Sequence, residues 1–353
     1  MAGAVELELG LLEGFRFTCR PGCGLCCYAT PAVSPAERSR LVQIEPTARF
    51  LADTQGFKLL AARPEGGACT MLGDNRCRVH AARPFPCRVF PLLTHIGTRI
   101  QSTLVLSCPG VDLSPLESWS QDSPSRGETL GLDSEIAAAR KEAEDVPVGQ
   151  WLREGVAAES KIQHALRARG EMQECAEVLR ELSGRPLPLG PVRGGGLPPP
   201  GRERPIEELP LTFEAPNARV ALRSVGSSEY EVIELRESGG VRTVRGTYPV
   251  PERWPEMQPD GRRVLEGYGR YLLARDHFLW AAYHELRSGS RDSLKERLRA
   301  NVAEALAEVV RRGTVLALAG GHPSESLGVG EVAAGIRAVD AELLDRPTLG
   351  RVL

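Results

Sequence analysis

Cysteine is concentrated in one part of this chain. Eight of its nine cysteines fall within the first 108 of 353 residues, and only Cys175 lies beyond them. The eight are Cys19, Cys23, Cys26, Cys27, Cys69, Cys77, Cys87 and Cys108. Packing of an apolar core does not produce such a concentration, whereas thiolates are the ligands of zinc, iron and iron–sulfur clusters. We therefore predict that these eight thiols hold a metal or an iron–sulfur cluster.

The first four cysteines read Cys-x3-Cys-x2-Cys-Cys, from Cys19 to Cys27. A short bracket of this kind lets a tight turn aim two thiolates at one ion. Gly22 and Gly24 suit that turn, because glycine reaches positive φ without steric cost. The adjacent Cys26 and Cys27 are difficult to place around one tetrahedral centre. Either one of them serves a second centre or a bridging position, or one is a free thiol beside the metal.

The next three cysteines surround a predicted turn. The sequence Gly-Asp-Asn at 73–75 is turn chemistry, so Cys69 and Cys77 are expected on opposite arms of a short hairpin. A brief helical turn should then run up to Arg83, because a residue before proline is pushed out of the helical region. Cys87 follows shortly after, and all three thiols can converge.

Other elements should position the remaining ligand. A capping box beginning at Ser34 predicts a helix to about Val42, and residues 50–62 form a second apolar stretch. Alternating residues over 98–106 predict a strand that ends near Cys108.

Three other interpretations compete with metal binding. Disulfides persist in oxidising compartments, but residues 1–12 contain acidic residues and no apolar signal-peptide core, and no run approaches the ~20 apolar residues of a membrane helix. We therefore expect a cytoplasmic protein, in which this spacing indicates metal or redox chemistry. Cys-x3-Cys-x2-Cys also matches radical S-adenosylmethionine enzymes, but no βα repeat follows residue 27. Inert buried thiols are the third alternative.

Residues around the second group could support the site without binding metal. Arg83 and Arg88 could compensate the negative charge of a four-thiolate site, although both could equally be surface arginines of an arginine-rich chain. His80 could donate a hydrogen bond to a ligand or bind metal, and a structural histidine is the alternative.

Both cysteine groups together carry a specific resemblance. The Cys-rich opening, followed by Cys-x7-Cys-x-Val-His-x2-Arg-Pro-x2-Cys-Arg-x-Phe-Pro, resembles the YkgJ-type cysteine-cluster family over residues 13–110. The chain departs from the family opening by having three residues between Cys19 and Cys23, and it has His80 where the family often has tyrosine. The resemblance implies a zinc- or iron-chelating domain. A similar module in flagellin lysine N-methylase is associated with an iron–sulfur centre and methyl transfer, so a lysine N-methylase-like enzyme is an alternative, although no glycine-rich fingerprint for the methyl donor stands out.

The identity of the metal depends on the ligand set. Structural zinc takes four cysteine or histidine ligands, while iron–sulfur clusters are held by four thiolates, and eight cysteines could serve one or two centres. The region offers only His80 and His95 besides cysteine. We favour an iron–sulfur cluster, 4Fe–4S rather than another type, with zinc as the alternative.

The fold predicted for the whole chain is α+β in four segments. These are a small Cys-rich metal-binding domain (1–115), a helical segment (116–183), a flexible Pro/Gly-rich linker (184–210) and a C-terminal β-meander followed by helices (211–353). Cys175 falls among the apolar positions of a predicted helix and is interpreted as core. Strands are expected over 218–225, 230–236 and 241–248, and helices over 261–287, 293–312 and 330–345. Residues 315–321 are expected to form a buried helix end or strand.

Charge and motifs limit the function. A net charge of −2 gives no electrostatic case for nucleic acid. Two hypotheses remain: a cluster active in redox or protein-modification chemistry, whose C-terminal domain selects a protein partner, or a structural zinc site in an adaptor protein.

Overall fold

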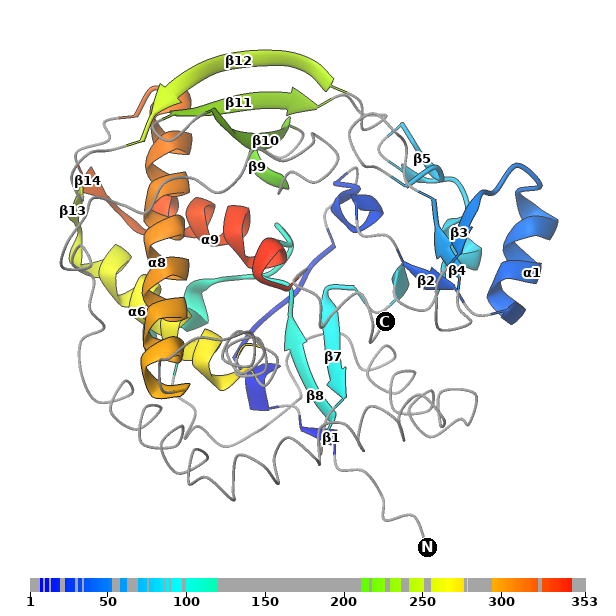
Figure 1. Cartoon of the computed structure of the whole chain (residues 1–353), viewed down its shortest axis with the longest axis horizontal. Coiled ribbons are helices and arrows are strands. Elements are labelled where there is room, and N and C mark those ends of the chain that lie inside the picture. The colour runs from blue at the N-terminus through cyan, green and yellow to red at the C-terminus, as the bar shows by residue number, and fades with distance from the viewer. Residues whose placement is uncertain are drawn as a thin grey trace, which may run out of the picture.

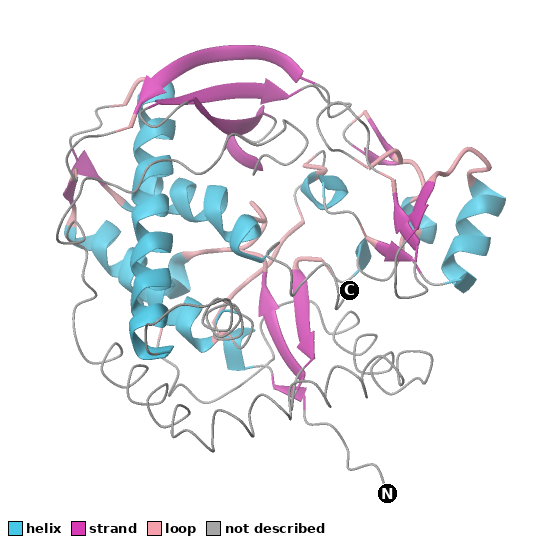
Figure 2. Ribbon diagram, viewed as in Figure 1, coloured by secondary structure: helices cyan, strands magenta, loops and turns pink. Residues whose placement is uncertain are grey.

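The computed structural model is a mixed α+β protein (Figures 1 and 2). It describes residues 7–8, 10–12, 14–19, 23–28, 31–33, 35–52, 58–61, 69–74, 76–84, 87–88, 90–96, 100–119, 211–215, 218–225, 229–235, 241–250, 255–275, 278, 294–322 and 326–344. The predicted helices within 133–182, the predicted linker at 184–210 and Cys175 lie outside these residues.

The first 119 residues contain two small units. In one, β8 (Ile100–Leu104) pairs in parallel with β1 (Leu7–Glu8) and antiparallel with β7 (Leu92–Ile96). The strand β8 lies within the strand predicted at 98–106, whereas β7 was not predicted. A 3-10 turn, η4 (Ser114–Ser118), follows this sheet.

The second unit surrounds most of the cysteines. Helix α1 (Pro35–Ile44) begins at the proline of the predicted capping box and carries Glu37 in its first turn. Beside it, β4 (Lys58–Leu60) pairs with β2 (Ala32–Val33) and β3 (Phe50–Ala52), and β5 (Leu72–Gly73) pairs with β6 (Arg76–Cys77). Figure 1 shows these elements together at one side of the molecule.

The C-terminal sheet is an antiparallel meander. Its strands are β9 (Leu211–Ala215), β10 (Ala218–Val225), β11 (Glu229–Leu235) and β12 (Val241–Pro249), in the order β12-β11-β10-β9. The last three agree with the predicted strands, and β9 is an addition. Leu222, Tyr230 and Val232 of this sheet pack against Val315 and Leu316 of helix α8.

Three long helices lie beneath the sheet (Figure 1). They are α6 (Pro259–Ala274), α8 (Leu294–Ala319) and α9 (Val329–Leu344), and the short strands β13 (Glu256–Met257) and β14 (Ser326–Leu327) pair in parallel beside them. Residues 315–319, expected as a helix end or strand, form the last turn of α8, and Val315, Leu316 and Ala317 in it are buried. Among the described residues, no helix is long and apolar enough to cross a membrane.

Helix α6 is interrupted within the helix predicted over 261–287, of which residues 276–277 and 279–287 lie outside the described part of the chain. It ends at Ala274, and Arg275 has an extended backbone (φ −79°, ψ 120°) while its N–H donates to Leu272 O at 3.1 Å. The apolar periodicity that predicted a longer helix continues past this point, but the side chain of Arg275 is fully buried in a polar network. A buried charge requires partners, and the backbone leaves the helix where those partners are reached.

One apolar cluster joins the two ends of the chain. Side chains from residues 11–119, including Phe15, Leu104 and Leu116, pack with Tyr271 of α6 and Val310 of α8. At Gly267 of α6, an added methyl group would overlap the carbonyl oxygen of Leu116, so α6 and η4 approach each other at backbone distance. The division into four separately folding segments stays a prediction, and the described residues of 11–119 and 255–344 share this cluster.

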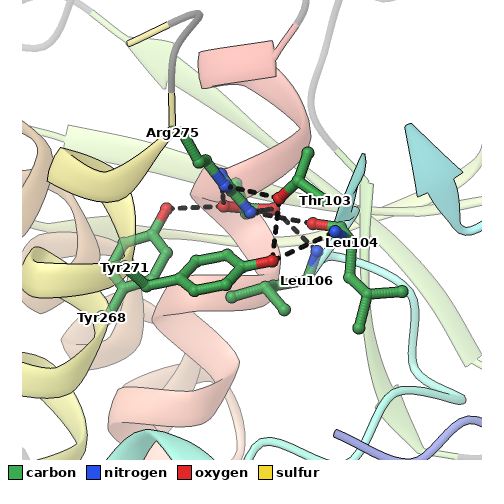
Figure 3. Close-up of polar contacts among 7 residues, drawn as sticks. Thr103, Leu104, Leu106, Tyr268, Tyr271 and Arg275 are labelled. Atoms are coloured by element: carbon green, nitrogen blue, oxygen red, sulfur yellow. Dashed lines mark hydrogen bonds and ion pairs between the residues drawn. The ribbon is translucent and has the colours of Figure 1, made fainter. Parts of the chain in front are cut away.

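A polar network lies within the same cluster (Figure 3). Arg275 forms an ion pair with Asp340 of α9, with Nη1 2.7 Å from Oδ1, and its Nη2 donates to Leu104 O at 2.8 Å. Its Nε donates to Thr103 Oγ1 at 3.1 Å, and the Tyr268 hydroxyl donates to Asp340 Oδ1 at 2.9 Å. The network therefore fastens β8 to both α6 and α9.

Candidate metal centre

The vicinal cysteines lie on a 3-10 turn. Cys26 and Cys27 belong to η2 (Leu25–Tyr28), and the N–H of Cys27 donates to Gly24 O at 3.0 Å. Gly24 has φ 62°, the left-handed conformation expected from the sequence. Because both thiols sit on one short turn, they remain neighbours although their side chains project from successive residues.

Backbone contacts join the second cysteine group to the first. The N–H of Cys69 donates to Cys27 O at 2.6 Å, so residues 42 positions apart in sequence lie side by side. The predicted turn is present at Asp74 (φ 48°), and Cys77 lies on β6 opposite Leu72. Cys77 is therefore on one hairpin arm as predicted, whereas Cys69 lies three residues before the other arm.

Cys87 and Cys108 also sit at turns. The helical turn η3 (His80–Ala82) ends at Arg83, whose backbone is extended (φ −51°, ψ 141°), as the following proline predicted. The N–H of Cys87 then donates to Pro84 O at 3.0 Å. Cys108 follows β8, and its N–H donates to Val105 O at 3.0 Å.

Cys26 acts electrostatically on several of the other thiols. Its charge raises the pKa values of Cys19, Cys77, Cys87 and Cys108, in each case after the larger effect of burial. All eight described cysteines are free thiols. The thiols from both groups are thus close enough to influence one another electrostatically, and none of these eight forms a disulfide.

The vicinal pair divides its protons unequally. A hydrogen bond from Cys27, together with the charge of Arg83, lowers the pKa of Cys26 to about 7, although burial opposes this shift. The same hydrogen bond and burial raise the pKa of Cys27. Cys26 is therefore partly ionised to the thiolate near neutral pH, while Cys27 keeps its proton.

The thiols lie in two packing environments. Cys27 and Cys69 are buried in the small core below α1, with Cys26 and Cys77 packed against it. Cys108 belongs instead to the large cluster that includes the C-terminal helices, and Cys23 packs against that cluster. Cys23 also acts on the pKa of Cys108, and Cys26 does so more weakly. Cys26, which packs against the small core, is therefore also near enough to act on a thiol of the large cluster.

Three sulfurs accept hydrogen bonds from the backbone at the same spacing. The N–H of Met71 donates to Cys69 Sγ at 3.4 Å, and the N–H groups of Val79 and Gly110 lower the pKa values of Cys77 and Cys108 in the same way. In each case the donor lies two residues after the cysteine. An N–H aimed at sulfur favours the thiolate form, which is the form that binds metal.

Arg83 lies among the thiols. Its positive charge lowers the pKa values of Cys19, Cys26, Cys77 and Cys87, although burial has a larger effect than Arg83 on each of the four. In the described structure its Nε is buried and has no hydrogen-bond partner. A buried cationic N–H without an acceptor is the arrangement expected beside a group that carries negative charge when complete.

The other two predicted supporting residues are placed differently. Arg88 approaches Glu37 of α1, with Nη2 3.9 Å from Oε1, and its side chain is 46% exposed. The side chain of His80 is largely exposed. The small part of it that is desolvated, and after that the charge of Arg83, lower its pKa. His95 lies on β7.

The donors suit a soft metal, but they are not assembled as a finished site. Within the described residues, no group of three or more Cys, His, Asp or Glu side chains is placed to hold a metal ion. The donor chemistry nevertheless fits zinc or an iron–sulfur cluster, since it combines thiols, N–H groups directed at sulfur and the partly buried guanidinium of Arg83. Binding would require the thiol side chains to close around the metal.

Comparison with known proteins finds a family model similar to this region. Residues 18–108 match the family model of the CxxCxxCC domain, described as "Putative zinc- or iron-chelating domain". This is the YkgJ-type cysteine-cluster family expected from the motifs, and the match begins one residue before Cys19 and ends at Cys108. Neither the curated proteins nor the solved structures gave a match.

Two residues at this site were not predicted. Arg337 and Asp340 of α9 bind the backbone beside Cys108, as described below. On the sequence they are an arginine and an aspartate three positions apart on an amphipathic helix, and nothing in the local pattern distinguishes them from a solvent-exposed pair.

Proposed function

We propose that the chain is a metalloprotein whose N-terminal thiols bind an iron–sulfur cluster, 4Fe–4S rather than another type, for redox or protein-modification chemistry. Metal binding is the part of this proposal that the family match supports, because that domain is described as zinc- or iron-chelating. The observation that carries the proposal is that Cys26 of the first sequence group is close enough to act electrostatically on Cys77, Cys87 and Cys108 of the second.

The surroundings of the thiols support a negatively charged group. Arg83 places a guanidinium among them, and backbone N–H groups approach Cys69, Cys77 and Cys108. Hydrogen bonds to sulfur and nearby charge are the means by which proteins set the potential of iron–sulfur clusters. When bound, such a cluster would supply one-electron chemistry, and the proposed ligands are drawn from the eight cysteines of residues 19–108.

The surroundings of Cys26 support its assignment as a metal ligand. It is the thiol that acts on most of the others, and its pKa of about 7 leaves it partly ionised at neutral pH. Cys27 beside it is protonated and buried. This arrangement supports a division of labour in which Cys26 binds metal and Cys27 serves a different position or remains a thiol.

Structural zinc is the second candidate, and burial favours it. Cys27 and Cys69 are 8% and 7% exposed and belong to the small core below α1. A core of this size is commonly stabilised by a bound metal. In that case the protein would act as an adaptor, with residues 211–353 binding another protein. Both candidates place the protein in the cytosol, where free thiols are maintained.

A visible spectrum separates the two candidates. The full-length protein would be purified anaerobically and its spectrum recorded before and after dithionite. Absorption near 400 nm that bleaches on reduction is expected for the iron–sulfur cluster, whereas colourless protein with stoichiometric zinc would support the adaptor. Cys175→Ser is the matched control, because this cysteine lies outside both groups, and the spectrum should be unchanged.

A further inference from the structure

The loop that carries Cys108 is hydrogen-bonded to a side chain of helix α9. Arg337 Nη1 donates to the carbonyl oxygens of Leu106, at 3.3 Å, and of Cys108, while its Nη2 donates to Val111 O at 2.8 Å. One guanidinium therefore binds three carbonyls of a six-residue segment. Arg337 and Cys108 are 229 positions apart in sequence.

Asp340 binds the same loop one helical turn later. Its Oδ2 accepts the N–H of Leu106 at 2.7 Å, and residues three apart on a helix share a face. Asp340 itself accepts hydrogen bonds from Arg275 and Tyr268, and Figure 3 labels these two side chains close to Leu106. The α9 face that meets the loop is thus part of the buried network rather than a mobile surface.

The backbone around Cys108 is also held by contacts within the loop and with Thr18. The N–H of Val111 donates to Cys108 O at 3.1 Å, and Gly110 approaches Thr18 so closely that an added methyl group would overlap the Thr18 carbonyl oxygen. Thr18 N–H in turn donates to Gly110 O at 2.9 Å, directly before Cys19. The backbone on either side of Cys108 is therefore held by Arg337 on one side and by Thr18 on the other.

We infer that Arg337 is a positioning residue for Cys108, and that through it α9 sets how well this thiol can serve as a ligand. The inference rests on the proposed metal site. Coupling of this kind is reciprocal, so metal binding at Cys108 should also stabilise the contact between the loop and α9.

The test measures metal affinity in the full-length protein. Reduced protein would be titrated anaerobically with Co²⁺, and the thiolate-to-cobalt charge-transfer absorption would report both affinity and the number of sulfur ligands. Arg337→Gln should weaken Co²⁺ binding about tenfold, the lower end of the range for residues that orient ligands. Arg337→Lys, which keeps the charge but cannot bind three carbonyls, should give an intermediate loss.

A double variant separates positioning from general stability. If Arg337 acts through Cys108, Arg337→Gln should cause no further loss of affinity when Cys108 is already serine. Arg263→Gln is the matched control, because Arg263 is an exposed arginine that bridges to Glu117 at 3.7 Å, and its affinity should equal that of the wild type.

The outcomes are distinguishable. Unchanged Co²⁺ affinity in Arg337→Gln, or an equal additional loss on the Cys108→Ser background, would overturn the role of Arg337 while leaving the metal site intact. Absence of the charge-transfer band in the wild type would overturn the metal site, and the role of Arg337 with it. If Arg337→Gln does not fold, Arg337→Lys decides, since unchanged affinity in that variant is also contrary to the inference.

Discussion

The guanidinium of Arg275 and the carboxylate of Asp340 lie 2.7 Å apart, and both side chains are fully buried. The pair joins the residue after α6 to the C-terminal half of α9, and Arg275 also donates to Leu104 O and Thr103 Oγ1. Charges removed from water are tolerated only with such partners. The pair therefore ties the sheet that leads to Cys108 to the C-terminal helices.

Removing one charge of this pair should destabilise the whole fold. We expect Asp340→Asn to lower the free energy of unfolding by about 3 to 5 kcal/mol, because it leaves the Arg275 guanidinium buried without its counterion. Urea unfolding followed by circular dichroism measures this change. Arg263→Gln, which breaks only the exposed bridge to Glu117, should cost less than about 1 kcal/mol. Equal midpoints for Asp340→Asn and the wild type would show that the pair contributes nothing.

Single serine substitutions in the vicinal pair should lower metal content unequally. Cys26 has the lower pKa and acts on four other thiols beyond its neighbour, so Cys26→Ser should remove more metal per chain than Cys27→Ser. Elemental analysis of anaerobically purified variants measures the difference, with Cys175→Ser as the control. Complete loss from both changes would contradict a division of labour between the two thiols.

The two arginines predicted to support the site should behave differently. Arg83→Gln removes a positive charge from among the thiols, so it should raise the pKa of Cys26 above about 7 and weaken metal binding about tenfold. Arg88→Gln should have little effect, since Arg88 is half-exposed beside Glu37. The alkylation rate of the Cys26 peptide as a function of pH, followed by mass spectrometry, gives the pKa. Identical profiles for the two variants would assign no special role to Arg83.

Glu308 should make the stability pH-dependent. Burial opposes its charge, but Arg312, Arg311 and the hydroxyl of Tyr230 outweigh burial and lower its pKa in the folded protein below 4.5. Its contribution is therefore fully present above about pH 4.5 and is lost as the pH falls through the lower, folded-state pKa.

Glu308→Gln tests this assignment. The variant should be less stable than the wild type at pH 7, and the difference between the two should shrink as the pH falls below 4. Urea midpoints measured between pH 3 and 7 show the trend. A constant difference across that range would mean that the carboxylate charge is not what stabilises the contact.

Local patterns predicted the turns around the cysteines and part of the fold, whereas the assignment of the cysteines as ligands stays a prediction. The glycine turn at Gly24, the hairpin turn at Asp74 and the end of the helical turn at Arg83 each depend on a few neighbouring residues, and each is present in the structure. Alternating residues likewise identified β10, β11 and β12.

Long-range partners account for what the sequence did not predict. The apolar periodicity around Arg275 resembles that of a continuous helix, and the break occurs because its charge meets Asp340, 65 residues later. The contact of Arg337 with the Cys108 loop spans 229 positions. No local pattern encodes such pairings, because they depend on how α9 packs against the rest of the molecule.

X-ray absorption at the metal edge of the anaerobically purified protein tests the central claim most directly. Thiolate ligation predicts a shell of sulfur neighbours at about 2.3 Å for zinc, or sulfur and iron shells for a cluster. A first shell containing only nitrogen and oxygen, or protein free of metal, would contradict the assignment of these cysteines as ligands.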